Sequence, residues 1–208
     1  MNQYDLSDLK EATSDIALDS LYAAKKAIAV DCREYIIWTG IMSPKVEEIA
    51  CPSDQKKLAI AITLTMLGHL PTKPITCPFC IQYSGDQACR GCGYALTHGG
   101  RCDEDTSAFS RFIEAFHELG KAILQDQDDC KLTLDIEQGK AMLHEFVDSS
   151  AAKARRLLDE LPETSVDRLM EIKALYLDQM ICLIPIFFFS KEVEIERQRV
   201  RKELQHYW

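Results

Sequence analysis

Five of the nine cysteines in this chain lie between positions 77 and 102, and they have the chemistry of a metal site. Cys77-Pro-Phe-Cys80 is followed, after eight residues, by Cys89-Arg-Gly-Cys92. The two thiolates of a Cys-x2-Cys pair converge on one ion, and four sulfur ligands in a tetrahedron are the structural geometry that zinc prefers. The sequence therefore predicts a Zn²⁺ site with Cys77, Cys80, Cys89 and Cys92 as its ligands.

The residues around the two pairs suit such a site. Pro78 stiffens the first turn, and backbone amides of each turn are expected to point back at the sulfurs. Gly93 follows the second pair and tolerates the left-handed conformation that these turns need. Ser84-Gly85-Asp86 lies midway between the pairs and predicts the turn of a short hairpin.

Cys102 and His98 leave a second ligand set open. One tetrahedral ion needs four ligands, so Cys102 is expected to pack nearby as a buried thiol, with His98 as a surface loop residue. In the alternative, Cys80, Cys89, Cys92 and Cys102 hold an iron–sulfur cluster, which also takes four cysteines, and Cys77 lies outside it. Zinc is preferred because Cys-Pro-x-Cys and Cys-x-x-Cys-Gly are typical of zinc ribbons.

The stretch from Cys77 to Thr106 resembles short, five-cysteine, zinc-ribbon-like segments of small uncharacterised phage and bacterial proteins. The resemblance covers about thirty of the 208 residues. Those segments usually have proline where Gly93 stands here. The resemblance implies that Cys102 lies in the neighbourhood of the site, and it implies no activity.

No other pattern in the chain predicts catalysis. The glycine-rich phosphate loops, the Gly-x-Ser-x-Gly nucleophile motif and the His-Glu-x-x-His zinc motif are all missing from the sequence. Glu114-Ala-Phe-His117 occurs once, whereas di-iron bundles use such a motif twice. We therefore predict no catalytic residues and regard an enzymatic function as disfavoured.

Composition narrows the function further. The formal net charge of −9 disfavours general binding to nucleic acid, because such affinity depends on Lys and Arg neutralising phosphates. The N-terminal residues show no signal peptide, and nine cysteines without a secretory signal indicate a reducing, cytoplasmic compartment. Cys32 and Cys182 are expected in the core. The apolar run Met180–Phe189 is too short to cross a bilayer, so it is expected to be buried and not to contact a membrane.

The elements around the cysteines read as helices, which predicts an all-α bundle of about six helices. Residues 1–69 and 106–208 are expected to supply the bundle, and residues 70–105 to form the loop-rich, zinc-ribbon-like, metal-binding insert. Within the first part, a helix over 5–39 is expected to end at Gly40 and a short one to begin at Pro44. Residues 58–67 fit either a buried helix or a strand, and the helix is preferred.

The preferred function is that of a helical protein whose structural zinc stiffens the insert and presents a surface to a protein partner. The expected contact residues are the aromatic Tyr83 and Tyr94, taken as exposed, and the basic Arg90 and Arg101. Self-association through the C-terminal helices near Ile184–Phe189 is a further expectation. The alternatives are an iron or iron–sulfur redox protein and, more weakly, a nucleic-acid reader that uses the insert.

Overall fold

The computed structural model describes residues 11–85, 89–126 and 135–207, and in these ranges every regular element is a helix. The α-helices are α2 (Leu18–Glu47), α3 (Pro52–Gly68), α4 (Pro78–Tyr83), α5 (Gly93–Thr97), α6 (Ala108–Gln125), α7 (Ile136–Glu160), α8 (Val166–Leu183) and α9 (Lys191–Leu204). Single 3-10 turns lie at Pro74–Thr76 (η1), Leu161–Glu163 (η2) and Ile186–Phe188 (η3). The predicted all-α fold is confirmed for this part of the chain.

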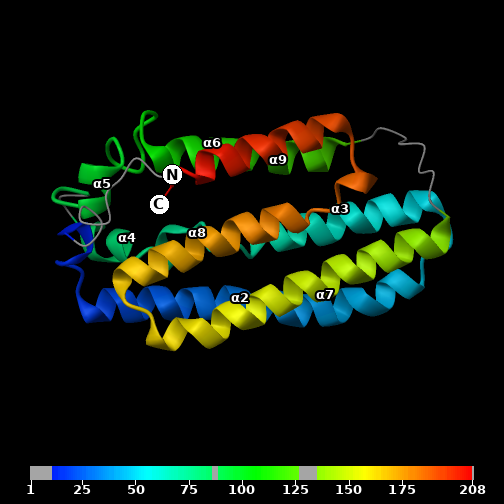
Figure 1. The fold of residues 1–208 in the computed structure, drawn as a ribbon, viewed down its shortest axis with the longest axis horizontal. Helices are drawn as coiled ribbons and strands as arrows, with labels where there is room; N and C mark the ends of the chain where they lie inside the picture. The colour runs from blue at the N-terminus through cyan, green and yellow to red at the C-terminus, as the bar shows by residue number, and fades with distance from the viewer. Residues whose placement is uncertain (1–10, 86–88, 127–134, 208) are drawn as a thin grey trace.

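The long helices form an elongated bundle with three levels (Figure 1). α6 packs along α9 on one side, and α2 packs along α7 on the other. α3 and α8 lie between these pairs. α3 contacts α6 and α7, whereas α8 contacts α7 and α9. The short helices α4 and α5 gather at one end of the bundle, so the cysteine-rich segment is supported by the ends of the long helices.

The core follows from the three- and four-residue spacing of apolar side chains. In α6, Phe112, Leu119 and Ile123 are fully buried, and the Ser107 side chain caps the helix by accepting a hydrogen bond from the Ser110 amide at 3.0 Å. Some buried polar groups on this scaffold are paired across helices. Tyr35 of α2, for example, donates a 2.7 Å hydrogen bond to Ser150 of α7.

The expected end of the first helix at Gly40 is wrong, because α2 continues to Glu47 with Pro44 inside it. Proline lacks the N–H that would bond the Gly40 carbonyl, but it lies in the last turns of the helix, where few bonds depend on it. Val46, beyond the proline, is completely buried. Packing of this side chain outweighs the local helix-breaking preference.

Residues 58–67 belong to helix α3, which confirms the preferred reading of this segment. Ala59, Ile62 and Met66 are buried at helical spacing, whereas Ile60 and Leu64, which a strand would bury with Ile62, are only half-buried. The alternation of large and small residues in the sequence therefore has no structural counterpart.

The apolar run near the C-terminal helices is buried only in part, and it is interrupted around Pro185 by η3. Met180, Ile181, Ile184, Phe188 and Phe189 are buried, whereas Phe187 is 42% exposed. Among the described residues, no helix is both long and apolar enough to span a membrane.

The insert differs from a zinc ribbon in the residues that the structure describes between 70 and 105. Cys77 and Cys80 begin a helix, α4, and Cys92 precedes another, α5, so no strand of a hairpin is formed here. Part of the expected turn, Asp86, lies outside the described residues. Proline at the first position of α4 favours the helix, because its fixed φ suits a helical first turn.

Candidate metal centre

The five clustered cysteines come from three short pieces of the insert. Cys77 is the residue before α4, and Cys80 lies in its first turn. Cys89 has a positive φ of 65°, and Cys92 is the residue before α5. Cys102 follows α5 in a turn. A φ of this sign is uncommon for residues other than glycine, which marks the loop at Cys89 as tightly constrained.

The fold brings these thiols together. The Cys77 thiol donates a hydrogen bond to the sulfur of Cys80, which in turn is hydrogen-bonded to Cys102. Cys92 lies close enough to Cys77 and Cys89 to interact with both electrostatically. Cys102, which was expected nearby as a buried thiol, interacts with Cys80 and is half-buried.

The expected amide hydrogen bonds to sulfur are present at two of the cysteines. The sulfur of Cys77 accepts from the backbone N–H of Cys80. The sulfur of Cys92 accepts from the N–H groups of Tyr94 and Ala95. Such bonds favour the thiolate form, which is the form that binds metals.

In the absence of a metal, the surroundings of Cys77, Cys80 and Cys92 raise the pKa of each thiol. The hydrogen bond to Cys80, followed by burial, raises the pKa of Cys77 well above its usual value. The hydrogen bond to Cys102 is the main cause that raises the pKa of Cys80 to about 12, and burial raises the pKa of Cys92. A metal ion would have to displace these protons, so its apparent affinity should increase with pH.

A buried lysine faces the same thiols. Lys173 of α8 is 1% exposed, and its Nζ donates to the Thr76 carbonyl at 3.2 Å. It lines a small cavity of about 70 Å³ with Cys77, Cys80 and Cys102, whose sulfurs are close enough to influence its charge. Burial lowers the pKa of Lys173, and a thiolate nearby would oppose that effect.

Our sequence analysis missed Lys173, although a signal was present. Its position is four residues after Leu169 and four before Leu177, both of which are completely buried. A lysine at a buried position of a helical stripe indicates a buried partner or a charged site. The segment gives no sign, however, that this partner is the cysteine cluster.

Two expectations about the insert are wrong. Tyr94 is 2% exposed instead of lying on the surface, and its hydroxyl donates a 3.1 Å hydrogen bond to the Tyr207 carbonyl. His98 is also buried, and its ring stacks on Tyr94 with centroids 4.0 Å apart. The ring Nδ1 of His98 lies 2.7 Å from the Thr97 hydroxyl oxygen. These contacts make His98 part of the packing of the insert.

Gly93 has a different role from the predicted one. Around the second cysteine pair, the residues with positive φ are Cys89 and Gly91, whereas Gly93 begins α5. A Cβ at Gly93 would overlap the backbone of Ala12, so glycine is needed there for close approach of the N-terminal segment.

The surface of the insert carries the other candidate contact residues. Arg90 and Arg101 are exposed, and Tyr83 is half-buried. Arg101 forms ion pairs with Asp103 and Glu104, which offset its charge. Leu96, which the sequence analysis did not single out, is 79% exposed beside them in the sequence.

The cysteines outside the insert do not all behave as predicted. Cys32 is completely buried, and burial raises its pKa to about 12. Cys182 is exposed, so its assignment to the core is wrong. It lies on the outer side of α8, one position away from the buried Ile181.

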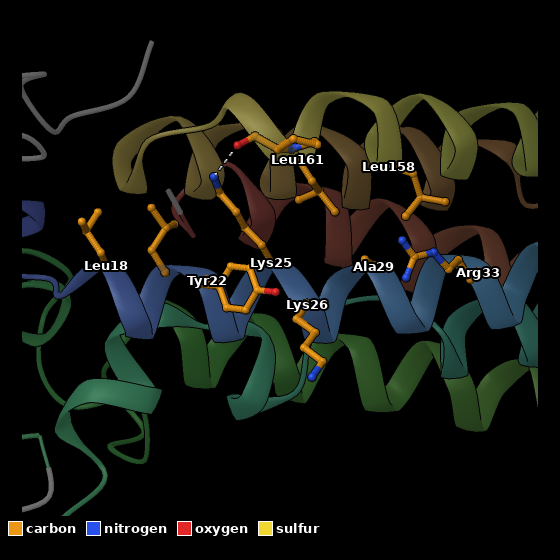
Figure 2. Close-up of a pocket in the computed structure, with 10 residues that line it drawn as sticks. Leu18, Tyr22, Lys25, Lys26, Ala29, Arg33, Leu158 and Leu161 are labelled. Atoms are coloured by element: carbon orange, nitrogen blue, oxygen red, sulfur yellow. Dashed lines mark hydrogen bonds between the residues drawn. The ribbon is translucent and has the colours of Figure 1, made fainter.

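A larger hollow lies away from the cysteines, along the N-terminal half of α2. This groove, of about 670 Å³, is bordered by α2, the end of α7 and η2, and Figure 2 shows the side chains around it. Lys25, Lys26 and Arg33 line the groove together with apolar residues such as Leu158 and Leu161. No cysteine, histidine or carboxylate is among the residues that line the groove.

The cysteines lie close together, but their sulfurs do not surround a common point as the ligands of one metal ion do. Within 11–85, 89–126 and 135–207, no three His, Cys, Asp or Glu side chains are placed so that they could hold a metal ion together. The thiols would have to turn toward a common point. Comparison of the chain with family models, with curated proteins and with solved structures found no match.

Proposed function

We propose that the chain binds one structural Zn²⁺ through the cysteines of its insert. We further propose that the insert, held rigid by this ion, serves as a protein-interaction module. The observation that carries the proposal is the chain of contacts from Cys77 to Cys80 and Cys102, with Cys92 beside Cys77. Thiolates are soft ligands that suit zinc, and a cluster of thiols can supply its four ligands.

The ligands under this proposal are Cys77, Cys80 and Cys92, with Cys89 or Cys102 as the fourth. The spacing of the two pairs favours Cys89, and the hydrogen bond to Cys80 favours Cys102. Lys173 supports a site with four thiolates, because its positive charge offsets part of the net charge of −2 that such a zinc centre carries.

The metal would act by joining α4, α5 and the turn that holds Cys102. These pieces are too short to be stable by themselves, and a bound metal supplies folding free energy in such segments. The stiffened insert then presents Tyr83, Arg90 and the exposed Leu96 to a partner protein.

The first test is to purify the protein without air and to measure zinc, iron and acid-labile sulfide per chain. We expect a colourless protein with one zinc ion, whose removal by a chelator lowers the melting temperature. A brown protein with iron and sulfide would replace this proposal by the iron–sulfur alternative. A protein that takes up neither metal would overturn both.

A series of single Cys→Ser variants then identifies the ligands. We expect Cys77→Ser, Cys80→Ser and Cys92→Ser to lose zinc, together with one of Cys89→Ser and Cys102→Ser. Cys182→Ser is the matched control, because this cysteine is exposed and distant from the insert in sequence. Equal zinc content in all variants would contradict the assignment.

A further inference from the structure

Three thiols of the insert line one small cavity, and the middle one contacts the other two. Cys77, Cys80 and Cys102 border the cavity of about 70 Å³, and all three are free cysteines. Cys80 is hydrogen-bonded to Cys77 on one side and to Cys102 on the other. Cys80 thus has two neighbours with which its sulfur can form a disulfide.

Contacts in pairs suit a disulfide without further rearrangement of the cluster. A disulfide needs two sulfurs that approach each other to about 2.05 Å. A metal needs several ligands around a common point, and no three side chains of the described residues have that arrangement. The thiols can therefore be oxidised in the arrangement that the metal-free chain already has.

Access to solvent distinguishes the two neighbours of Cys80. Cys102 is half-buried in a turn, and the residue on either side of it is exposed. Cys77, in contrast, lies between two buried residues. Thiol oxidation depends on exposure, so a small oxidant reaches Cys102 more easily than Cys77. Cys80 then lies in contact with the oxidised sulfur.

We propose that hydrogen peroxide joins Cys80 to Cys102 in a reversible disulfide, and that this disulfide regulates the metal site. Formation of the disulfide in the metal-free chain requires no metal. The regulation rests on the proposed zinc-binding function.

The reaction transfers two electrons from the two sulfurs to the peroxide. The sulfur of Cys102 attacks one peroxide oxygen and the O–O bond breaks, which gives a sulfenic acid (S–OH), and the thiol proton leaves with the hydroxide as water. The sulfur of Cys80 then attacks the sulfur of the sulfenic acid. The S–O bond breaks, and the hydroxyl leaves as a second water with the Cys80 proton. Two thiols and one peroxide thus give one disulfide and two waters, and a thiol reductant restores the thiols.

The disulfide removes ligands from the metal and takes over part of its structural role. With Cys80 and Cys102 oxidised, three of the five clustered thiols remain, fewer than a tetrahedral zinc site needs. The new bond joins α4 to the turn that follows α5. It closes a loop of about twenty residues, which restricts the unfolded chain. Oxidation should therefore release zinc and raise the melting temperature of the metal-free chain.

Peroxide treatment of the reduced, metal-free chain tests the pairing. Trypsin cuts after Arg90 and Arg101, so Cys80 and Cys102 fall on different peptides. After free thiols are blocked and the chain is digested, we expect mass spectrometry to detect peptide 58–90 linked to peptide 102–111. A reductant should separate the two. A disulfide found only within 58–90, or the absence of any disulfide, would overturn the proposal.

Variants identify the cysteine within the longer peptide, which also contains Cys77 and Cys89. Cys80→Ser should abolish the cross-link to 102–111. Cys77→Ser is the matched control, because it removes a thiol from the same cavity, and it should keep the cross-link. A cross-link that persists in Cys80→Ser would contradict the assignment. The digest of the wild-type chain tests the pairing independently of how the variants fold.

The zinc-loaded chain tests the regulation separately. We expect an equimolar amount of peroxide to release zinc in proportion to the cross-link, as measured with a chromogenic chelator, and a thiol reductant to restore binding. Zinc that stays bound to the cross-linked chain would refute the regulatory role. A chain that takes up no zinc would overturn the proposed function, whereas the cross-link in the metal-free chain would still decide whether the disulfide forms.

Discussion

His98 stacks on Tyr94 inside the insert, and its burial there makes the insert sensitive to acid. Burial lowers the pKa of His98 from 6.5 to about 4. Between these values the unfolded chain binds a proton that the folded chain does not, so the free energy of unfolding falls as the pH decreases. The full shift corresponds to about 3 kcal/mol.

His98→Phe should remove this pH dependence, because phenylalanine keeps the stacking on Tyr94 and does not titrate. We expect urea denaturation to show wild type losing stability from pH 7 to pH 4 relative to His98→Phe. Replacement of the exposed His117 by Gln is the control and should leave the wild-type profile unchanged. Parallel profiles for wild type and His98→Phe would contradict the assignment.

Lys173 should contribute to metal affinity and not to the stability of the metal-free chain. Lys173→Met keeps a similar shape but removes the charge near Cys77 and Cys80, so we expect zinc affinity to fall at least about tenfold. The melting temperature without metal should stay the same or increase, because burial of a lysine is costly. Competition with a chromogenic chelator measures the affinity, and Lys191→Met, at an exposed position, is the control. Equal affinity in Lys173→Met would contradict this role.

At the scale of elements, α3 and α7 approach each other through a glycine. Gln55 of α3 is completely buried and donates a 2.8 Å hydrogen bond to the Ile136 carbonyl. A Cβ at Gly139 would overlap the Gln55 amide. Gly139→Ala should therefore lower the free energy of unfolding by about 1–3 kcal/mol.

Gly120→Ala is the matched control for this prediction. Gly120 lies within α6, and a Cβ there meets no atom within 4 Å. Alanine should stabilise this helix by about 0.5–1 kcal/mol, because it restricts the unfolded chain without a clash. Chemical denaturation of both variants checks the pair, and a stabilised Gly139→Ala would contradict the close approach.

The sequence predicted which segments are helical better than it predicted where the helices end and which side chains are buried. Apolar spacing identified α6, because a periodic pattern reports directly on the face that is buried. At 58–67 the apolar residues alternate as in a strand, and only the helical surroundings favoured the helix that the structure shows. It placed the end of α2 at Gly40, because local preference carries no information about the packing of Val46. The cysteine spacing identified the candidate site, but the burial of Tyr94 and Lys173 depends on α8 and Tyr207, which are distant in the sequence.

At the scale of the whole molecule, Asp126 joins three helices. Its carboxylate forms a 3.0 Å ion pair with Lys56 of α3 and accepts a 2.8 Å hydrogen bond from the Ser190 amide, which precedes α9. The side chain of Asp126 is 1% exposed. Asp126→Ala should lower the free energy of unfolding by about 3–5 kcal/mol, because it removes one partner of a buried ion pair.

The neighbouring pair in α3 provides the control for Asp126. Lys57 and Asp54 are 3.5 Å apart, and the lysine side chain is 76% exposed. Asp54→Ala should change the free energy of unfolding by less than about 1 kcal/mol. Urea denaturation of the two variants measures both effects, and similar losses would show that burial does not distinguish the pairs.

The hydrogen bond from Tyr94 to Tyr207 spans 113 residues, and this separation affects the kinetics of folding. Contacts between distant residues form late, because the chain must first lose the entropy of a large loop. Until α9 docks, the thiols of the insert lie close together in sequence but remain open to solvent. Oxidants can then form disulfides between cysteines that are free in the folded chain. Docking of α9 therefore competes with disulfide formation at this end of the bundle, and a reducing environment favours docking.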